Sequence, residues 1–230
     1  MEMSKISVIV PVYNEQQTLA EIIQKVQSIN LDKEIIIVDD CSTDDTRNIL
    51  KTIQAENIQI LYHSKNQGKG AAIRTALAKV TGDIVIIQDA DLEYDPNDYL
   101  VLIEPIVNGK ADVVYGSRFL GKGPHRVMMF WHYFANVMFT LLTNMLYNIN
   151  LTDMGTCYKV FRTHILKSIK LKSNRFGFEP EITAKICKSK VKIFETAISY
   201  SGRTYLDGKK ISWTDSFSYL WCLVKYRFWN

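Results

Sequence analysis

Short β-branched segments alternate with segments of helical periodicity along the first half of the chain. The strand-like segments are residues 6–10, 34–38, 58–62, 84–87 and 112–116. Between them, apolar residues recur at the three- and four-residue spacing of a helix that packs on one face. This alternation is typical of a parallel α/β sheet joined by right-handed crossovers. In such a sheet the loops that follow the strands share one rim, where ligands bind.

The fourth strand-like segment ends in acidic residues. Asp89, Asp91 and Glu93 alternate directly after it. Three carboxylates this close repel one another unless a cation lies between them, and Mg²⁺ or Mn²⁺ prefers such oxygen ligands. A surface turn with helix-capping acids is the other interpretation, because Asp95 and Pro96 can begin a further helix. This stretch alone does not decide between the two.

The composition bounds the class of protein. A chain of 230 residues that is 47% hydrophobic suits one globular domain, or one domain with an appendage. Its net charge of +4 is too small to argue for nucleic acid as a partner. The four cysteines are far apart without a CxxC pair, so neither a zinc site nor a disulfide framework is expected. With no signal-peptide pattern and no uncharged segment of spanning length, we expect a cytoplasmic protein.

Three motifs stand where predicted strands end. They are Val-Pro-Val-Tyr-Asn-Glu at 10–15, Val-Asp-Asp-Cys-Ser-Thr-Asp-Asp-Thr at 38–46 and Asp-Ala-Asp at 89–91. In this order they resemble the inverting glycosyltransferases of family two. The resemblance implies the GT-A fold, a Rossmann-like and mostly parallel sheet flanked by helices. It also favours the metal interpretation of the acidic residues over the surface turn.

The resemblance implies a donor-binding role for residues of the first two motifs. Pro11, Tyr13 and Glu15 would line the nucleotide pocket. Asp40 would hydrogen-bond the base or the ribose of a nucleotide-sugar. A helix-capping carboxylate is the alternative for Asp40, although Asp44 suits that capping role better.

For the acidic stretch, the resemblance implies that Asp89 and Asp91 contact the donor and the metal, with Glu93 as a further ligand. Mg²⁺ or Mn²⁺ is therefore the expected cofactor, and Asp91 is expected to be needed for catalysis. A Gly-Lys-Gly segment at 68–70 lacks the spacing of a P-loop. It is expected to begin a helix with a solvated lysine, although a helix start there could favour an anion.

The Gly-Ser-Arg-Phe segment at 116–119 resembles one subgroup of this family, which transfers sugars to polyprenyl phosphates. Dolichol-phosphate mannose synthases are its best-known members. Arg118 would bind the acceptor phosphate with its planar fork of donors. A surface arginine paired with a nearby acid is the alternative. Three later segments resemble the same subgroup, at 153–162, 174–181 and 201–211.

The subgroup implies roles for residues of the second half. A basic loop with Arg203 and Lys210 would close over the donor diphosphate, and Arg126 would assist at the acceptor. Asp153 is the candidate if a general base is needed, although a phosphate acceptor is already anionic near neutral pH. The residues around Asp153 differ from those of the mannose synthases, which leaves the sugar open. Glu179 fits a helix start, where the dipole favours acids.

Two aromatic-rich segments are expected at a membrane surface. Residues 125–149 are nearly all apolar, with polar residues at about helical spacing, namely His132, Asn136, Thr140, Thr143 and Asn144. These polar residues disfavour a helix that spans the membrane. A helix that lies in the membrane interface, or beside a lipid groove, fits the pattern better. Residues 213–230 mix aromatic and basic side chains, which suits lipid headgroups. A buried helix hairpin and a C-terminal helix docked on the core are the alternatives.

These expectations divide the chain into a nucleotide-sugar-binding core at 1–124, an interface helix region at 125–150, an acceptor-side completion of the catalytic domain at 151–212 and an aromatic, basic helix at 213–230. We expect an inverting hexosyltransferase. It would move a sugar from a nucleotide-sugar of the GDP-mannose or UDP-glucose type to dolichyl or undecaprenyl phosphate. It would act as a peripheral protein on the cytosolic face of a membrane. The alternatives are transfer to a glycan hydroxyl and a non-catalytic nucleotide-sugar-binding module.

Overall fold

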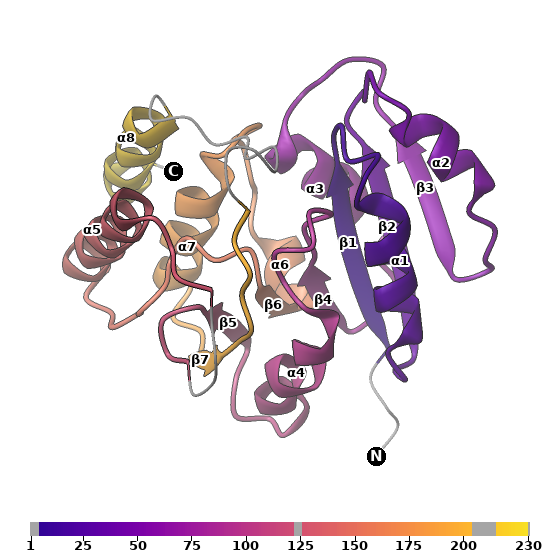
Figure 1. The fold of residues 1–230 in the computed structure, drawn as a ribbon. Coiled ribbons are helices and arrows are strands. Elements are labelled where there is room, and N and C mark those ends of the chain that lie inside the picture. Colours follow the sequence, from indigo (N-terminus) through magenta and orange to yellow (C-terminus); the bar gives the residue numbers. More distant parts are fainter. Residues whose placement is uncertain (1–4, 122–125, 204–214, 230) are drawn as a thin grey trace.

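The computed structural model describes residues 5–121, 126–203 and 215–229 (Figure 1). The strands are β1 (Ile6–Val12), β2 (Lys33–Asp39), β3 (Ile58–Tyr62), β4 (Ile84–Ile87), β5 (Val113–Ser117), β6 (Lys159–Arg162) and β7 (Ile193–Ala197). The helices are α1 (Leu19–Ser28), α2 (Thr46–Thr52), α3 (Lys69–Leu77), α4 (Tyr99–Val107), α5 (Phe130–Tyr147), α6 (Thr163–Ser168), α7 (Phe178–Lys188) and α8 (Asp215–Phe228). A 3₁₀ turn, η1 (Pro96–Asp98), leads into α4.

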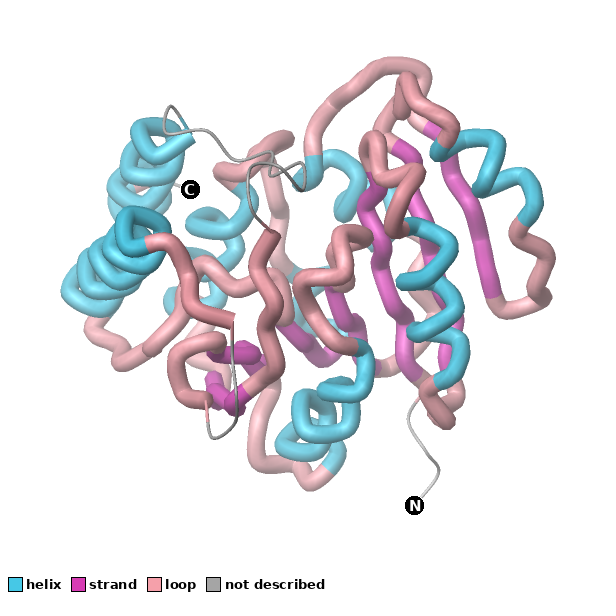
Figure 2. The backbone as a smooth tube through the Cα atoms, in the orientation of Figure 1, coloured by secondary structure: helices cyan, strands magenta, loops and turns pink. Residues whose placement is uncertain are grey.

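The strands form one seven-stranded sheet in the order β3-β2-β1-β4-β6-β5-β7, flanked by helices (Figure 2). β6 runs antiparallel to β4 and β5, whereas the other neighbouring strands are parallel. The mostly parallel α/β fold predicted from the sequence is confirmed. Because β1 has β2 on one side and β4 on the other, the strand order reverses at β1. Open α/β sheets bind ligands at such a point.

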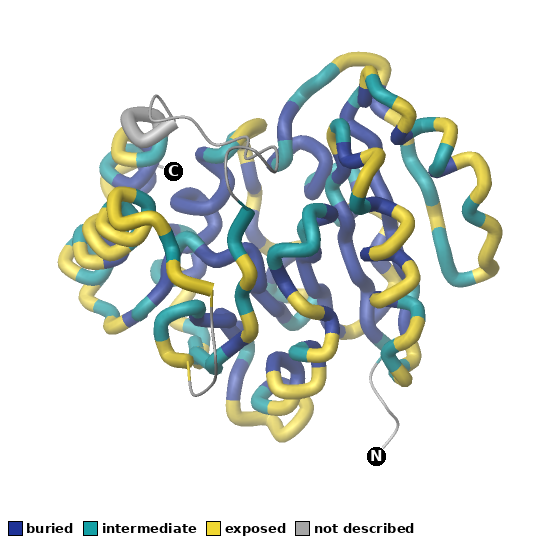
Figure 3. Tube along the Cα trace, viewed as in Figure 1, coloured by how far each residue is buried: buried dark blue, intermediate teal, exposed yellow. Residues whose placement is uncertain are grey.

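The core of the molecule is the central part of this sheet. Val8, Ile9, Ile36, Val85 and Ile86 are all buried, and the central strands are dark blue in Figure 3. Strands covered by helices on both faces bury every side chain, which is why their sequences read as continuous β-branched runs. This burial holds the ends of β1, β2 and β4 in fixed positions, and with them the loops that carry the predicted site.

β6 and β7 were not predicted from the sequence. β6 consists of only Lys159, Val160, Phe161 and Arg162, with a charged residue at each end, so its periodicity is too short to indicate a strand. It nevertheless inserts between β4 and β5, where Lys159 is fully buried. This insertion brings the segment that precedes β6 against the ends of β4 and β5.

Helices α5, α7 and α8 pack together at the side of the molecule away from β3 (Figure 1). The Tyr147 hydroxyl of α5 donates to the Leu223 carbonyl of α8 at 2.9 Å. The rings of Phe139 and Tyr219 lie 5.0 Å apart across the same pair of helices. α5 and α8 therefore form one surface, although more than 70 residues separate their hydrogen-bonded partners.

The buried side chains of α5 are polar, and one of them binds the backbone of a neighbouring segment. The only buried side chains of this helix are those of Thr140 and Thr143. The Thr140 hydroxyl accepts a hydrogen bond from the Met154 backbone N–H at 3.1 Å. Asn144 donates to the Leu151 carbonyl at 2.8 Å and accepts from its N–H at 2.9 Å. The polar residues at helical spacing thus fix the 151–154 segment.

The outward side of α5 carries large apolar side chains. Trp131 is 74% exposed and Met145 is 72% exposed, and Phe130, Phe134 and Leu141 are exposed as well. α5 is therefore not the buried helix hairpin that was the alternative expectation. In the described part of the chain, no helix combines the length and the apolar character needed to cross a bilayer.

Candidate active site

One pocket of about 900 Å³ lies at the carboxyl ends of β1, β2 and β4. Every predicted site residue that the structure describes lines it, with the exception of Asp153. These residues are Pro11, Tyr13, Glu15, Asp40, Asp89, Asp91, Glu93, Arg118, Arg126 and Arg203. Lys210 lies outside the described residues. Loops far apart in the sequence are therefore brought together around one cavity.

Two of the acidic residues after β4 face different cations. Lys69 Nζ lies 2.8 Å from Asp89 Oδ1 and 3.0 Å from Asp89 Oδ2. Arg203 Nη2 lies 3.3 Å from Asp91 Oδ2. Gln88, which follows β4, is fully buried, and its side-chain amide donates to the Asp89 carbonyl at 2.9 Å. The site thus carries closely spaced charges of both signs on a rigid base.

Glu93, the third predicted metal ligand, has other partners. It accepts hydrogen bonds from the Tyr200 hydroxyl at 2.8 Å and from the Arg203 backbone N–H at 2.7 Å. Among the residues that the structure describes, no group of three His, Cys, Asp or Glu side chains is placed to hold a metal ion. The predicted set of three ligands is therefore not gathered into one site, because the third carboxylate is turned toward the 200–203 segment.

Asp91 and Asp89 differ in how their negative charges are compensated. Burial and the negative charges of Asp89 and Glu93 raise the pKa of Asp91 to about 7, against the opposing charge of Arg203. Burial acts in the same sense on Asp89, but the Lys69 ammonium group lowers the pKa of Asp89 below its usual value. A divalent cation would favour the charged form of Asp91. Asp89 and Asp91 thus fit the oxygen-ligand chemistry of Mg²⁺ or Mn²⁺.

Arg203 connects the end of β1 with the loop after β4. Its Nη1 and Nη2 donate to the two carboxylate oxygens of Glu15, each at 3.1 Å. Such two-pronged pairing fixes the plane of the guanidinium. Its Nε is buried and has no hydrogen-bond partner among the described residues. Arg203 thus has Glu15, Asp91 and Glu93 around it, as Lys69 has Asp89.

Asp40 supports the loop that leads into α3. Its carboxylate accepts hydrogen bonds from the backbone N–H groups of Gln67 at 2.8 Å and Gly68 at 2.6 Å. His63 Nδ1 lies 2.7 Å from the same carboxylate. Gly68 has a φ of +96°, and a Cβ there would lie 2.5 Å from the Asn174 carbonyl oxygen, so both conformation and space require glycine. Asp40 borders the pocket while both its oxygens are engaged in this loop.

Lys69 and Glu179 also line the pocket, although neither was predicted to be a site residue. Lys69 was expected to be solvated, but it lies 3.2 Å from Glu179 and is paired with Asp89. Glu179 is buried and also pairs with the fully buried Lys159. These charges alternate in sign from the acidic loop into the interior. No spacing in the sequence links these residues. Lys69 begins α3, Lys159 begins β6 and Glu179 lies in α7, and only the fold brings these elements together.

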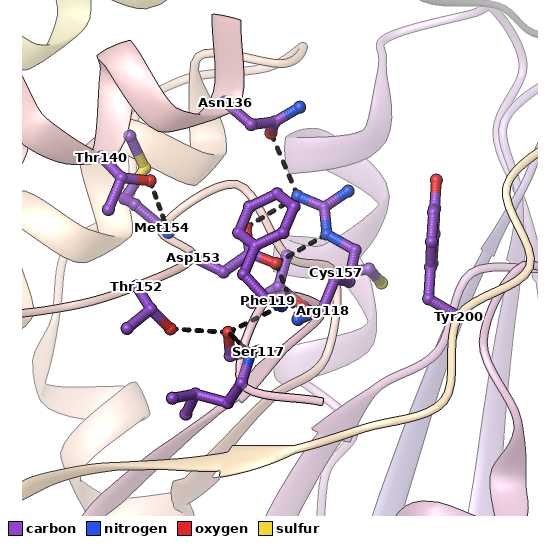
Figure 4. Close-up of polar contacts among 12 residues, drawn as sticks. Ser117, Arg118, Phe119, Asn136, Thr140, Thr152, Asp153, Met154, Cys157 and Tyr200 are labelled. Carbon is purple, nitrogen blue, oxygen red and sulfur yellow. Dashed lines mark hydrogen bonds and ion pairs between the residues drawn. The ribbon is translucent and has the colours of Figure 1, made fainter. Parts of the chain in front are cut away.

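Arg118, which lines the pocket, and Asp153 form a buried ion pair (Figure 4). Asp153 accepts hydrogen bonds from the backbone N–H of Arg118 at 3.1 Å, from Nε at 2.6 Å and from Nη2 at 2.7 Å. Burial opposes the charge of the guanidinium, but the Asp153 carboxylate holds the pKa of Arg118 well above its usual value. Arg118 lines the pocket and Asp153 lies behind it. This placement lets Asp153 orient Arg118 rather than reach a substrate.

The pocket continues from Arg118 into an apolar arm beside α5. This part of the wall is formed by Met128, Met129, Trp131, Ala135, Phe139, Phe176 and Tyr219. Its residues come from the start and inner side of α5, from the segment before α7 and from α8. One cavity therefore has a charged end over the sheet and an apolar end between helices. A ligand that fits the whole of it has a polar head and an apolar tail.

Comparison with known proteins shows the family of the chain. The family model described as glycosyl transferase family 2 matches residues 7–170. A UDP-N-acetylglucosamine–dolichyl-phosphate N-acetylglucosaminyltransferase of Methanococcus voltae is 30% identical, over 84% of this chain and 84% of that protein. An undecaprenyl-phosphate 4-deoxy-4-formamido-L-arabinose transferase of Sodalis glossinidius is 29% identical, over 91% of this chain and 64% of that protein.

A further relative and a solved structure are also similar to this chain. A dodecaprenyl-phosphate galacturonate synthase of Rhizobium johnstonii is 26% identical, over 87% of this chain and 60% of that protein. Among solved structures, glucosyl-3-phosphoglycerate synthase of Mycobacterium tuberculosis, in complex with Mn²⁺, uridine diphosphate and phosphoglyceric acid, has a TM-score of 0.75. That match is 19% identical, covers 99% of this chain and 80% of the other, and shows the GT-A fold alone. The chain belongs to glycosyl transferase family 2 and is similar to its polyprenyl-phosphate sugar transferases.

Proposed function

We propose that this protein transfers a sugar from a nucleotide-sugar to a polyprenyl phosphate, with inversion at the anomeric carbon. The observation that carries the proposal is the single pocket with a charged end and an apolar arm, joined at Arg118. A polyprenyl phosphate has this combination of an anionic head and a hydrocarbon tail. The similarity to transferases whose names include dolichyl, undecaprenyl and dodecaprenyl phosphate supports the same acceptor class.

The donor is assigned to the charged end of the pocket. Pro11 and Tyr13 at the end of β1 line the space for the nucleotide, next to Asp40. Asp89 and Asp91 would hold Mg²⁺ or Mn²⁺. When bound, the cation would neutralise negative charge on the leaving diphosphate. Arg203 lies beside Asp91 and adds a further positive charge at this end of the pocket.

The acceptor phosphate is assigned to Arg118. Its guanidinium is held by Asp153 and faces the pocket between the charged end and the apolar arm. A phosphate oxygen would attack the anomeric carbon on the side opposite the diphosphate, so that the new C–O bond forms as the bond to the diphosphate breaks. The phosphate is already anionic near neutral pH and needs little help from a base. Arg118 therefore aligns the nucleophile rather than removing a proton.

The membrane is assigned to the outward faces of α5 and α8. Trp131 and Met145 project from α5, and Trp221 and Phe228 are exposed on the adjoining α8. Lys225 and Arg227 in the last turn of α8, together with Arg126 before α5, would meet anionic headgroups. An acceptor whose tail stays in lipid requires the apolar arm to open toward a bilayer. We place this surface on the cytosolic face, where nucleotide-sugars are available.

The donor sugar is proposed as a class only. The similar relatives are named for three different sugars, N-acetylglucosamine, a formamido-arabinose and galacturonate, so similarity does not select one. A hexose carried on UDP or GDP remains our proposal. Mannose transfer of the dolichol-phosphate mannose synthase kind is one case within that class.

Turnover of a panel of UDP- and GDP-sugars, with Mn²⁺ and with or without a short-chain polyprenyl phosphate in detergent, tests the proposal. We expect nucleotide release and a lipid-linked sugar product only when the acceptor is present. Transfer to a soluble glycan hydroxyl, with none to the lipid, would select the polysaccharide alternative. Donor binding without any turnover would select the non-catalytic module.

A further inference from the structure

Asn136 joins the exposed helix α5 to the arginine of the acceptor end. Its Oδ1 accepts a hydrogen bond from Arg118 Nη2 at 3.0 Å. Its Nδ2 donates to the His132 carbonyl, one helical turn earlier, at 2.7 Å. Both ends of the amide are therefore engaged, and the two bonds together fix which way it points. Figure 4 shows this contact above the Arg118–Asp153 pair.

The donors of Arg118 can be accounted for one by one. An arginine side chain carries five N–H donors. The single hydrogen of Nε goes to Asp153, and the two hydrogens of Nη2 go to Asp153 and Asn136. This arrangement leaves the two hydrogens of Nη1 for the pocket, on the side where Tyr200 lies (Figure 4). The Arg118 guanidinium carbon lies 5.1 Å from the centre of the Tyr200 ring, so a phosphate would reach Nη1 beside this ring. Asn136 thus occupies the one Nη2 donor that Asp153 does not use.

Gly155 supplies the space in which this contact forms. A Cβ at position 155 would lie 2.6 Å from Asn136 Oδ1 and 3.5 Å from Arg118 Nη2. The first distance is too short for any side chain, so the amide would have to move away from the arginine. Gly155 has no positive φ, and it is therefore space rather than backbone conformation that requires glycine here.

We infer that Asn136 is a positioning residue for the acceptor step, and that Gly155 keeps open the space it needs. By saturating Nη2, Asn136 makes Nη1 the nitrogen that Arg118 presents to an incoming phosphate. The same contact ties the acceptor end to α5, which also carries the exposed Phe134 and Met145 outside the pocket. The residue that positions Arg118 and the exposed apolar side chains therefore lie on the same helix. This inference rests on the proposed function, because it concerns how the acceptor phosphate is received.

A double-mutant cycle with Asn136→Ala and Gly155→Ala tests the inference. The acceptor is a short-chain isoprenyl phosphate free in solution, so that membrane binding does not enter. Each single variant should raise the acceptor KM about tenfold, the effect of losing one hydrogen bond to a charged group, while the donor KM stays the same. The double variant should be no worse than Asn136→Ala alone, because removing the amide makes room for the new Cβ.

Two further variants guard against a loss of folding. Asn136→Leu keeps the approximate volume of the side chain without its acceptor, and should give the same rise in acceptor KM with a normal thermal transition. Asn48→Ala is the matched control, since Asn48 lies on α2 and its amide donates to Asp45 outside the pocket. It should leave both KM values unchanged.

The outcomes separate this inference from the proposed function. If the natural protein transfers sugar to the isoprenyl phosphate and the folded Asn136 variants keep its acceptor KM, the positioning role is refuted and the function stands. Additive losses from Asn136→Ala and Gly155→Ala would also refute it. If the natural protein transfers sugar to no prenyl phosphate at all, the proposed function and this inference both fail.

Discussion

The carboxylate of Asp153 and the guanidinium of Arg118 meet edge to edge, with Nε–Oδ2 at 2.6 Å and Nη2–Oδ1 at 2.7 Å. The Asp153 side chain is fully buried and that of Arg118 is 7% exposed. The backbone N–H groups of Thr152 and Asp153 in turn donate to Glu195 of β7, so the aspartate is held from behind. The pair is therefore a rigid unit at the boundary between the core and the pocket.

Asp153→Ala should destabilise the protein by about 3–5 kcal/mol, because it leaves a buried guanidinium without its counter-charge. Removing both partners, in Asp153→Ala with Arg118→Ala, should cost less than the single aspartate change. Urea unfolding of these two variants and of the natural protein measures this difference. An aspartate variant as stable as the natural protein would mean that water reaches the pair. Transfer should also fall in every one of these variants, through a higher acceptor KM.

Arg118→Lys should keep the positive charge but lose the fork of donors. A lysine cannot pair with Asp153 through two parallel hydrogen bonds and at the same time face a phosphate. We expect the acceptor KM to rise on the order of tenfold or more, with little change in donor affinity. Steady-state kinetics with each substrate varied in turn separates the two. A change confined to the donor KM would assign Arg118 to the donor end instead.

Asp91→Asn should abolish transfer while leaving the fold intact, because Asp91 lies on a rim loop rather than in the core. It should also remove the stabilisation that Mn²⁺ and a nucleoside diphosphate give in a thermal shift assay. Asp83→Asn is the matched control, since Asp83 is exposed and lies before β4, away from the pocket. Full activity of Asp91→Asn, or full activity of the natural protein in excess chelator, would rule out the metal assignment.

The sheet and its rim were predictable because they rest on local sequence patterns. A buried β-branched run followed by acids, as at Ile84–Ile87 and Asp89, reveals both the strand and the place where it ends. The pairing of Lys69 with Glu179 was not predictable. It depends on the packing of α3 against α7 and on the antiparallel insertion of β6, neither of which any short pattern contains.

Asp40 and Asp153 show a second limit of sequence reading. Both are acids beside the site, and residue type alone suggests that they contact substrate. In the structure Asp40 is occupied by two backbone N–H groups and His63, and Asp153 by Arg118. Residue type alone does not tell a carboxylate that positions another group from one that binds a ligand, and the contact of Asp40 with a nucleotide stays a prediction. The hydrogen-bond partners of each carboxylate in the structure are needed to distinguish the two roles.

Glu34→Gln should destabilise the protein at neutral pH and have little effect in strong acid. Burial alone would raise the pKa of Glu34, but hydrogen bonds from Ser7, Thr81 and Gly82 lower it to about 2. A depressed carboxyl pKa gives stability that is present above the unfolded value of about 4.3 and is lost as the pH falls toward 2. Unfolding midpoints of both proteins between pH 7 and pH 2 should therefore converge on acidification. Glu21→Gln, at an exposed helix position, should show no such convergence.

The apolar surface of α5 and α8 leads to the last prediction, which concerns membrane binding. Trp131→Ser with Trp221→Ser should strongly reduce binding to anionic vesicles, because exposed indoles supply the apolar insertion. Each basic residue near the headgroups should add about 1 kcal/mol, so binding by the natural protein should decline as salt rises. Leu100→Ser is the control, since Leu100 is 57% exposed but lies on α4. Co-sedimentation with vesicles measures all of these. Unchanged binding by the double tryptophan variant, or binding that Leu100→Ser weakens equally, would place the membrane contact elsewhere.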